Sequence, residues 1–125
     1  MKESIAHMHV ICEDWKRELN FFKTEMPLLR KRLDEVVSKN TDKTILAEVE
    51  HFENKFRVMA QNTDDLLHDV NVKNDSLNAQ AAAKGNYISV RMIESDQNME
   101  ELMQITAKDF YDTRKAYYAF LAKVM

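Results

Sequence analysis

The sequence predicts an all-α protein, an elongated three-helix antiparallel bundle that runs up, down and up with coiled-coil-like packing. Three observations lead to this fold class. The 125 residues include one Gly and one Pro, so the chain lacks the turn residues that an all-β sandwich or barrel needs between strands. A content of 45% hydrophobic and 31% charged residues is inconsistent with disorder or a membrane span. Apolar residues also recur with a helical period along most of the chain.

The first predicted helix covers residues 4–38. Its apolar residues follow one another at alternating spacings of three and four, which is the heptad pattern of a coiled coil, and we call such a row a seam. Pro27 lies beside this seam and removes one backbone hydrogen bond to Lys23, so we expect a kink or a local break, and the unbroken heptad phase favours a kink. The seam residues are Ile5, Met8, Cys12, Trp15, Leu19, Phe22, Met26, Leu29, Leu33 and Val36.

The second predicted helix covers residues 42–84. Asn40 or Thr41 is suited to cap its start, Asp42 favours its first turn, and Gly85 is suited to end it. We expect the seam to weaken after Val70, because the next seam positions include Lys73 and Gln80 and the stretch is rich in mediocre helix formers. The seam residues are Ile45, Val49, Phe52, Phe56, Met59, Thr63, Leu66 and Val70.

The third predicted helix covers residues 87–124, with Asn86 as its cap. The spacing slips between Met99 and Met103, which predicts a locally unwound supercoil. Three long helices joined by two short loops bury their seams against one another, so residues 1–125 are predicted to form one domain. The seam residues are Ile88, Met92, Met99, Met103, Thr106, Phe110, Thr113, Tyr117, Phe120 and Val124.

Composition argues against several classes of function. The 18 basic and 21 acidic residues give a net charge of −3 without a basic segment, so no nucleic-acid partner is expected. A single glycine, Gly85, cannot supply a phosphate-binding loop or a dinucleotide fingerprint. With no apolar run near the start and one cysteine, Cys12, we expect a cytoplasmic protein.

A metal-binding bundle, hemerythrin-like or holding zinc, is the alternative functional hypothesis. Asp65 and His68 have the spacing of helical carboxylate–histidine pairs, as do Glu48 and His51. Antiparallel threading brings His9 and Cys12 to about the height of three residues of the second helix, with two carboxylates across on the third. If the helix rotation differs from that of the seams, this ligand set suits zinc or a comparable ion. The facing residues are Asp65, His68, Asp69, Glu94 and Asp96.

The simpler interpretation assigns no metal and no cofactor. The seam phase turns His7, His51 and His68 outward, and only His9 flanks the core. Cys12 then behaves as a small buried hydrophobic residue, and neighbouring carboxylates point apart on the helix surface. We therefore predict no catalytic residues and no enzymatic activity.

Outward apolar residues indicate a protein partner. Phe21 and Leu28 are seven residues apart on the first helix, and Tyr111 and Tyr118 repeat this spacing on the third. With Val58 they fall in the same half of the rod, so we predict an interaction or scaffold protein that forms a homodimer through these residues and binds neither nucleic acid nor membrane. Eight methionines leave open a sensor with a ligand cavity inside the bundle.

Two resemblances accompany this interpretation. The segments LRKRLDEVVSKNT and VEHFENKF resemble those of small bacterial long-helix bundle proteins with no assigned function. The layout with Trp15 in the first seam is also similar to a spectrin-type repeat, although the third helix has no Trp and the helices are longer. Both resemblances imply a helical fold and transfer no functional residue.

Overall fold

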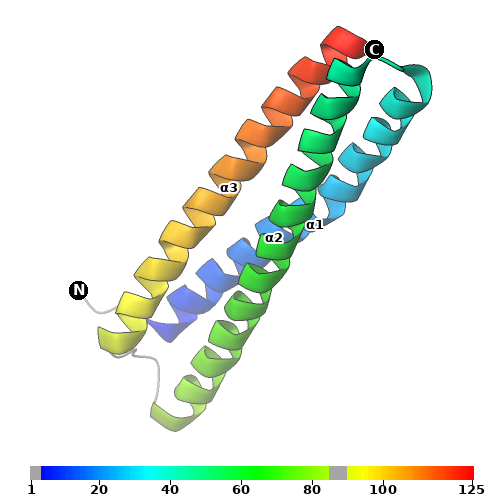
Figure 1. Cartoon of the computed structure of the whole chain (residues 1–125). Helices are drawn as coiled ribbons and strands as arrows, with labels where there is room; N and C mark the ends of the chain where they lie inside the picture. Colours follow the sequence, from blue (N-terminus) through cyan, green and yellow to red (C-terminus); the bar gives the residue numbers. More distant parts are fainter. Residues whose placement is uncertain (1–3, 85–89) are drawn as a thin grey trace.

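Three long helices make up the chain in the computed structural model, which describes residues 4–84 and 90–125, with side chains for residues 4–80 and 97–125. They are α1 (Ile5–Lys39), α2 (Lys43–Lys84) and α3 (Val90–Val124). Figure 1 shows α1 and α3 running in the same direction along a rod, with α2 antiparallel to both. The predicted all-α, up-down-up bundle is confirmed. No helix of the described residues is both long enough and apolar enough to cross a bilayer.

The seam of α1 packs as predicted. Ser4 caps the helix, its Oγ accepting a hydrogen bond from the His7 amide at 3.0 Å. Every predicted seam residue is buried except Trp15, which is half-buried and packs against the core. Pro27 lies inside a helix that continues to Lys39, so it does not split α1.

In the turn between α1 and α2, one polar side chain bonds to the end of α1 and another bonds to the start of α2. Asn40 belongs to α1, because its Nδ2 donates to the Val36 carbonyl at 2.8 Å. Asp42 caps α2, because its Oδ1 accepts from the amides of Thr44 at 2.8 Å and Ile45 at 3.3 Å. The prediction that Asn40 or Thr41 caps α2 is therefore wrong.

The seam of α2 weakens after Val70, as predicted, because polar residues enter the buried row there. Beyond Val70 the buried row continues through Lys73, Asn74 and Leu77, and the helix runs to Lys84. A fully buried Leu77 means that the seam does not end at Val70, although polar residues interrupt it. The expectations for Gly85, Asn86 and Ile88 lie outside the described residues, as do those for the side chains of Met92, Glu94 and Asp96.

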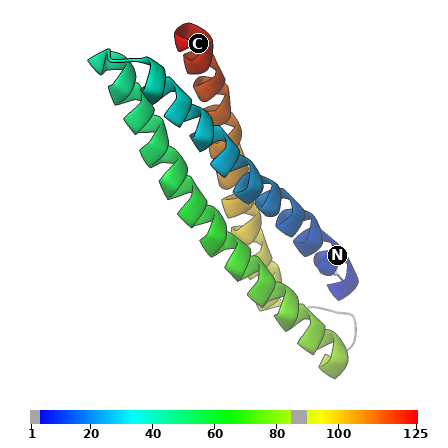
Figure 2. The same cartoon turned by 90° about the vertical axis from the view of Figure 1, so that its right-hand side faces the viewer.

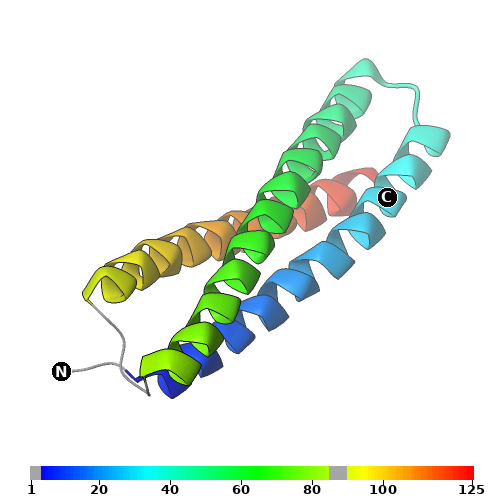
Figure 3. The same cartoon turned by 90° about the horizontal axis from the view of Figure 1, so that it is seen from below.

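Aromatic rings fill the half of the rod that contains the α1–α2 turn. Phe22 of α1 stacks on Phe110 of α3 at a centroid distance of 4.3 Å. Phe52 of α2 meets Phe120 of α3 at 5.4 Å. Figures 2 and 3 show α3 crossing α2 at an angle, so that the two axes separate toward both ends of α3, whereas α1 and α2 run side by side along the rod. Among the described side chains, the ring contacts that join α3 to α1 and α2 lie in its second half.

Candidate functional site

Four exposed apolar side chains flank the line along which α1 and α3 meet. Phe21 and Leu28 lie on α1, Tyr111 and Tyr118 lie on α3, and each is between 41% and 59% exposed. The parallel helices are locked in register there, because the Tyr117 hydroxyl donates to the Leu29 carbonyl at 2.7 Å. We call Phe21, Leu28, Tyr111 and Tyr118 the aromatic face.

Arg114 lies in the middle of the aromatic face and contacts rings of both helices. Its guanidinium carbon lies 5.1 Å from the ring centroid of Tyr111 and 6.0 Å from that of Phe21, distances typical of cation–π contacts. Arg114 also forms an ion pair with Glu25 at 3.8 Å, in which both side chains are about one quarter exposed. This pair ties α1 to α3 beneath the exposed rings.

Each exposed ring of the face rests on a core ring. Phe21 meets Phe110 edge-on at 6.0 Å, and Tyr118 meets Tyr117 at 5.3 Å. Edge-to-face packing of this kind orients a ring as well as burying part of it. The aromatic face therefore presents apolar surface in a fixed orientation, which lowers the entropy lost on binding.

Val58 does not belong to this face, although the sequence analysis grouped it there. It lies one helical turn after Lys55, whose Nζ pairs with Asp109 Oδ1 of α3 at 2.9 Å. Val58 is exposed on the α2–α3 side of the rod, away from α1. Residues at the same height along a bundle share one level, but a heptad pattern does not specify which neighbouring helix each outward side of α2 is turned toward.

The aromatic face carries charge of opposite sign toward its two ends. Glu18 lies seven residues before Glu25 on α1, and Arg32 lies seven residues after it. Neither Glu18 nor Arg32 forms an ion pair within the described part of the chain, whereas Asp14 nearby is paired with Arg17 at 2.9 Å. The α1 side of the face therefore has an acidic end and a basic end, with the Glu25–Arg114 ion pair between them.

The predicted metal ligands do not converge. Cys12 is fully buried, His9 is partly buried, and Asp65 and His68 are exposed. Asp65 Oδ1 instead accepts a hydrogen bond from Gln61 at 2.9 Å. Over residues 4–80 and 97–125, no group of three or more His, Cys, Asp or Glu side chains is placed to hold a metal ion.

The register of α1 against α2 explains this separation. Lys23 pairs with Asp64 at 3.1 Å, and Glu13 accepts from Asn74 at 3.2 Å. By these contacts His68 is level with Leu19, about 10 Å along the axis from Cys12 at 1.5 Å per residue. The expected common height of His9, Cys12, Asp65 and His68 is therefore wrong by about two helical turns.

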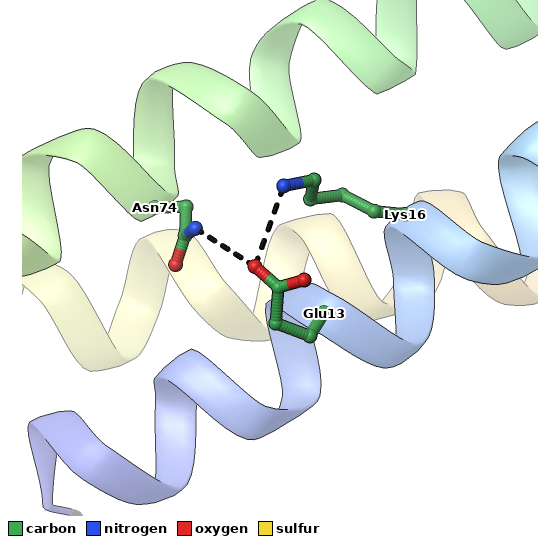
Figure 4. A network of polar contacts seen from close by, with 3 residues as sticks. All are labelled: Glu13, Lys16 and Asn74. Carbon is green, nitrogen blue, oxygen red and sulfur yellow. Dashed lines mark hydrogen bonds and ion pairs between the residues drawn. The ribbon is translucent and has the colours of Figure 1, made fainter.

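A polar layer lies between α1 and α2 near the N-terminal end of the rod (Figure 4). Glu13 Oε1 accepts hydrogen bonds from Asn74 Nδ2 at 3.2 Å and Lys16 Nζ at 3.3 Å. Asn74 is only 7% exposed, and within the described residues neither its Oδ1 nor the buried Nδ1 of His9 has a hydrogen-bond partner. The hydrogen bond between Asn74 and Glu13 is part-buried, and a polar contact of this type between helices specifies their register at a cost in stability.

Sequence reasoning missed this layer. Asn74 lies in the stretch after Val70 where the abundance of mediocre helix formers predicts only a weaker seam. The available signal was that Val70, Asn74 and Leu77 have the spacing of one buried helix face, with an amide in the middle.

Tyr117 is the one described group with a large pKa shift. Its side chain is fully buried, and this burial raises the pKa of the hydroxyl to about 12. The hydroxyl stays protonated and donates to the Leu29 carbonyl. The geometry therefore makes Tyr117 a structural tie between α3 and α1.

Comparisons of the chain with protein-family models, with curated proteins and with solved structures gave no significant match. Among the surfaces of the described residues, the aromatic face is supported from below by core rings and by the Arg114–Glu25 ion pair.

Proposed function

We propose that this protein is a non-enzymatic helical scaffold that forms a homodimer through the aromatic face. The observation that carries the proposal is the arrangement of Phe21, Leu28, Tyr111 and Tyr118 in two parallel rows of exposed apolar side chains on a supported surface. Contiguous apolar surface of this kind favours association, and aromatic residues with arginine are typical of interface centres.

The charges of the face favour an antiparallel arrangement of the two copies. Glu18 and Arg32 are equally distant from Glu25 along α1. A two-fold axis perpendicular to the rod at the level of Glu25 brings Glu18 of each copy opposite Arg32 of the other. A parallel arrangement places like charges together, which electrostatic complementarity disfavours.

The surface of the chain is large enough for such a dimer. It exposes 8186 Å², whereas a compact monomer of 14.7 kDa exposes about 6,900 Å². The difference, about 1,200 Å², is larger than the roughly 800 Å² that each partner contributes to a standard interface. Side-by-side pairing along the rods can therefore cover an ordinary interface without changing the fold.

Sedimentation equilibrium of the wild type, Leu28→Asp and Val37→Asp tests the proposal. Leu28 is 59% exposed on the aromatic face, and Val37 is 47% exposed one heptad after Arg30, which faces α2. We expect dimers for the wild type and Val37→Asp and monomers for Leu28→Asp. A monomeric wild type at high concentration, or an unchanged Leu28→Asp dimer, would contradict the proposal.

A charge exchange tests the antiparallel orientation separately. Glu18→Arg or Arg32→Glu alone places like charges opposite each other and weakens the dimer. Combining both substitutions in one chain restores opposite charges, so we expect the dimerisation constant to recover. If the double variant is no better than the single variants, the antiparallel arrangement is wrong.

A further inference from the structure

The α2–α3 side of the rod carries an open groove. It has a volume of about 280 Å³, and α2 contributes Leu66, Asp65 and Asp69 while α3 contributes Leu102 and Ile105. A smaller adjoining hollow of about 70 Å³ shares Ile105 and continues to Phe110. These residues lie near the middle of α2 and near the middle of α3.

Within the described residues, the apolar lining of the groove is exposed. Ile105 is 65% exposed and Leu102 is 50% exposed. Val58 and Val72, each one heptad from Asp65 on α2, add exposed apolar surface on the same side of that helix. The apolar surface therefore extends along the axis as a strip, which suits an elongated occupant.

The edge of the groove on α2 is negatively charged. Asp65 and Asp69 are exposed, and neither forms an ion pair with a cation of the described residues. Asp65 accepts a hydrogen bond from the neutral side-chain amide of Gln61. The nearby Asp64 and Asp109, by contrast, form ion pairs with Lys23 and Lys55. Two uncompensated carboxylates beside an apolar strip favour a cationic occupant.

We propose that this groove binds a basic amphipathic helix of a partner protein. Apolar side chains of that helix pack on Leu66, Leu102 and Ile105, and its lysines or arginines face Asp65 and Asp69. Binding of a helix by its apolar stripe is a common recognition mode, and here it adds a fourth helix to the bundle. The site lies on the opposite side of α3 from the aromatic face, so it does not depend on self-association.

Fluorescence anisotropy with a synthetic helical peptide of about 20 residues tests this site. The probe carries leucine at helical i, i+3, i+4 and i+7 positions with flanking lysines, and its control has glutamate in place of each lysine. We expect the lysine peptide to bind at least about tenfold more tightly than the glutamate peptide. Equal affinity for the two peptides would overturn the proposal.

Substitutions in the chain locate the binding. Asp65→Lys combined with Asp69→Lys is expected to weaken binding of the lysine peptide by at least about tenfold, and Ile105→Glu to abolish it. Asp34→Lys combined with Glu50→Lys makes the same charge change at exposed residues and should leave binding unaltered. Circular dichroism checks that each variant is folded. If Ile105→Glu does not fold, the double variant at the exposed Asp65 and Asp69 still tests the site.

The two proposals fail independently. The Leu28→Asp chain should bind the lysine peptide with wild-type affinity, because its substitution lies on the aromatic face. If the Asp65→Lys, Asp69→Lys double variant binds as well as the wild type, the groove proposal is wrong whatever the oligomeric state.

Discussion

The two halves of the rod hold α3 in different ways. In the half with the α1–α2 turn, rings join all three helices, since Phe22 stacks on Phe110 and Phe52 meets Phe120. In the half with the N-terminus, the described core is mainly aliphatic, and the buried Asn74 interrupts it. There the Glu13–Asn74 hydrogen bond joins α1 to α2.

This difference shows how one bundle can present two kinds of surface. Where core rings anchor α3, the exposed rings above them have a fixed orientation, which suits a rigid, symmetric contact. Between the middle of α2 and the middle of α3, the side chains leave an apolar groove that an added helix can fill. The packing of α3, more than the exposed residues alone, distinguishes the proposed dimer surface from the proposed helix-binding groove.

Phe22→Ala should have the largest effect on this comparison. Phe22 is fully buried and contacts Phe21, Phe110 and Tyr111, so its removal leaves a cavity between α1 and α3. We expect the free energy of unfolding in urea to fall by about 3 to 5 kcal/mol. A loss below about 1 kcal/mol would mean that the ring stack does not anchor α3.

Leu77→Ala should have a smaller effect, in the other half of the rod. Leu77 is fully buried, but its neighbours Lys73 and Asn74 are polar, so the site can relax more easily. We expect a loss of about 2 to 3 kcal/mol in urea unfolding. Hydrogen exchange should quicken near Leu77 while the second half of α3 stays protected. Equal loss of protection in both halves would contradict the comparison.

Tyr117→Phe should cost about 1 kcal/mol, because it removes the hydrogen bond to the Leu29 carbonyl and little packing. It also has a pH signature. Burial raises the pKa of Tyr117 from 10.0 to about 12, so above pH 10 the unfolded chain releases a proton that the folded chain keeps. The contribution of Tyr117 to stability is thus constant below pH 10 and falls as the pH rises toward about 12.

Urea unfolding across this pH range, in the wild type and Tyr117→Phe, measures the effect. The stability difference between the two proteins should shrink as the pH rises above 10. A constant difference would show that Tyr117 ionises equally in the folded and unfolded chains.

Lys23→Ala should have the smallest effect. Lys23 and Asp64 join α1 to α2, but both side chains are about half exposed, so solvent and salt screen their attraction. We expect a loss of about 0 to 1 kcal/mol that declines with added salt. A double-mutant cycle with Asp64→Ala isolates the interaction between the two side chains. A coupling energy above about 2 kcal/mol would contradict the small contribution expected of this pair.

The sequence was sufficient to predict the fold because each helix carries its own periodicity. The seam of α1 needs no knowledge of its partners, and its residues are buried as expected with Trp15 at the margin. The outward direction of His51 and His68 follows from the same phase and is also observed. Local capping was predicted less well, since Asn40 and Asp42 are both able to cap and only their contacts decide which does.

The arrangement between helices could not be predicted in the same way. The register of α1 on α2 depends on packing summed along both helices and on contacts such as Glu13 with Asn74, so the proposed height of His68 was wrong. The side of the rod on which Val58 lies depends on how α2 is rotated toward α3, which its heptad pattern does not specify. The sequence does predict that Phe21 and Leu28 lie with Tyr111 and Tyr118. Each pair is seven residues apart, and the two helices that carry the pairs run in the same direction.

The distance between two copies of one spin label tests the central claim most directly. A label on Ser38→Cys lies about 13 residues from the level of Glu25, near one end of the rod, and the buried Cys12 does not compete for it. An antiparallel dimer through the aromatic face predicts a separation of about 40 Å between the two labels, measured by pulsed electron paramagnetic resonance. A separation below about 20 Å, or no distance between chains at all, would contradict the account.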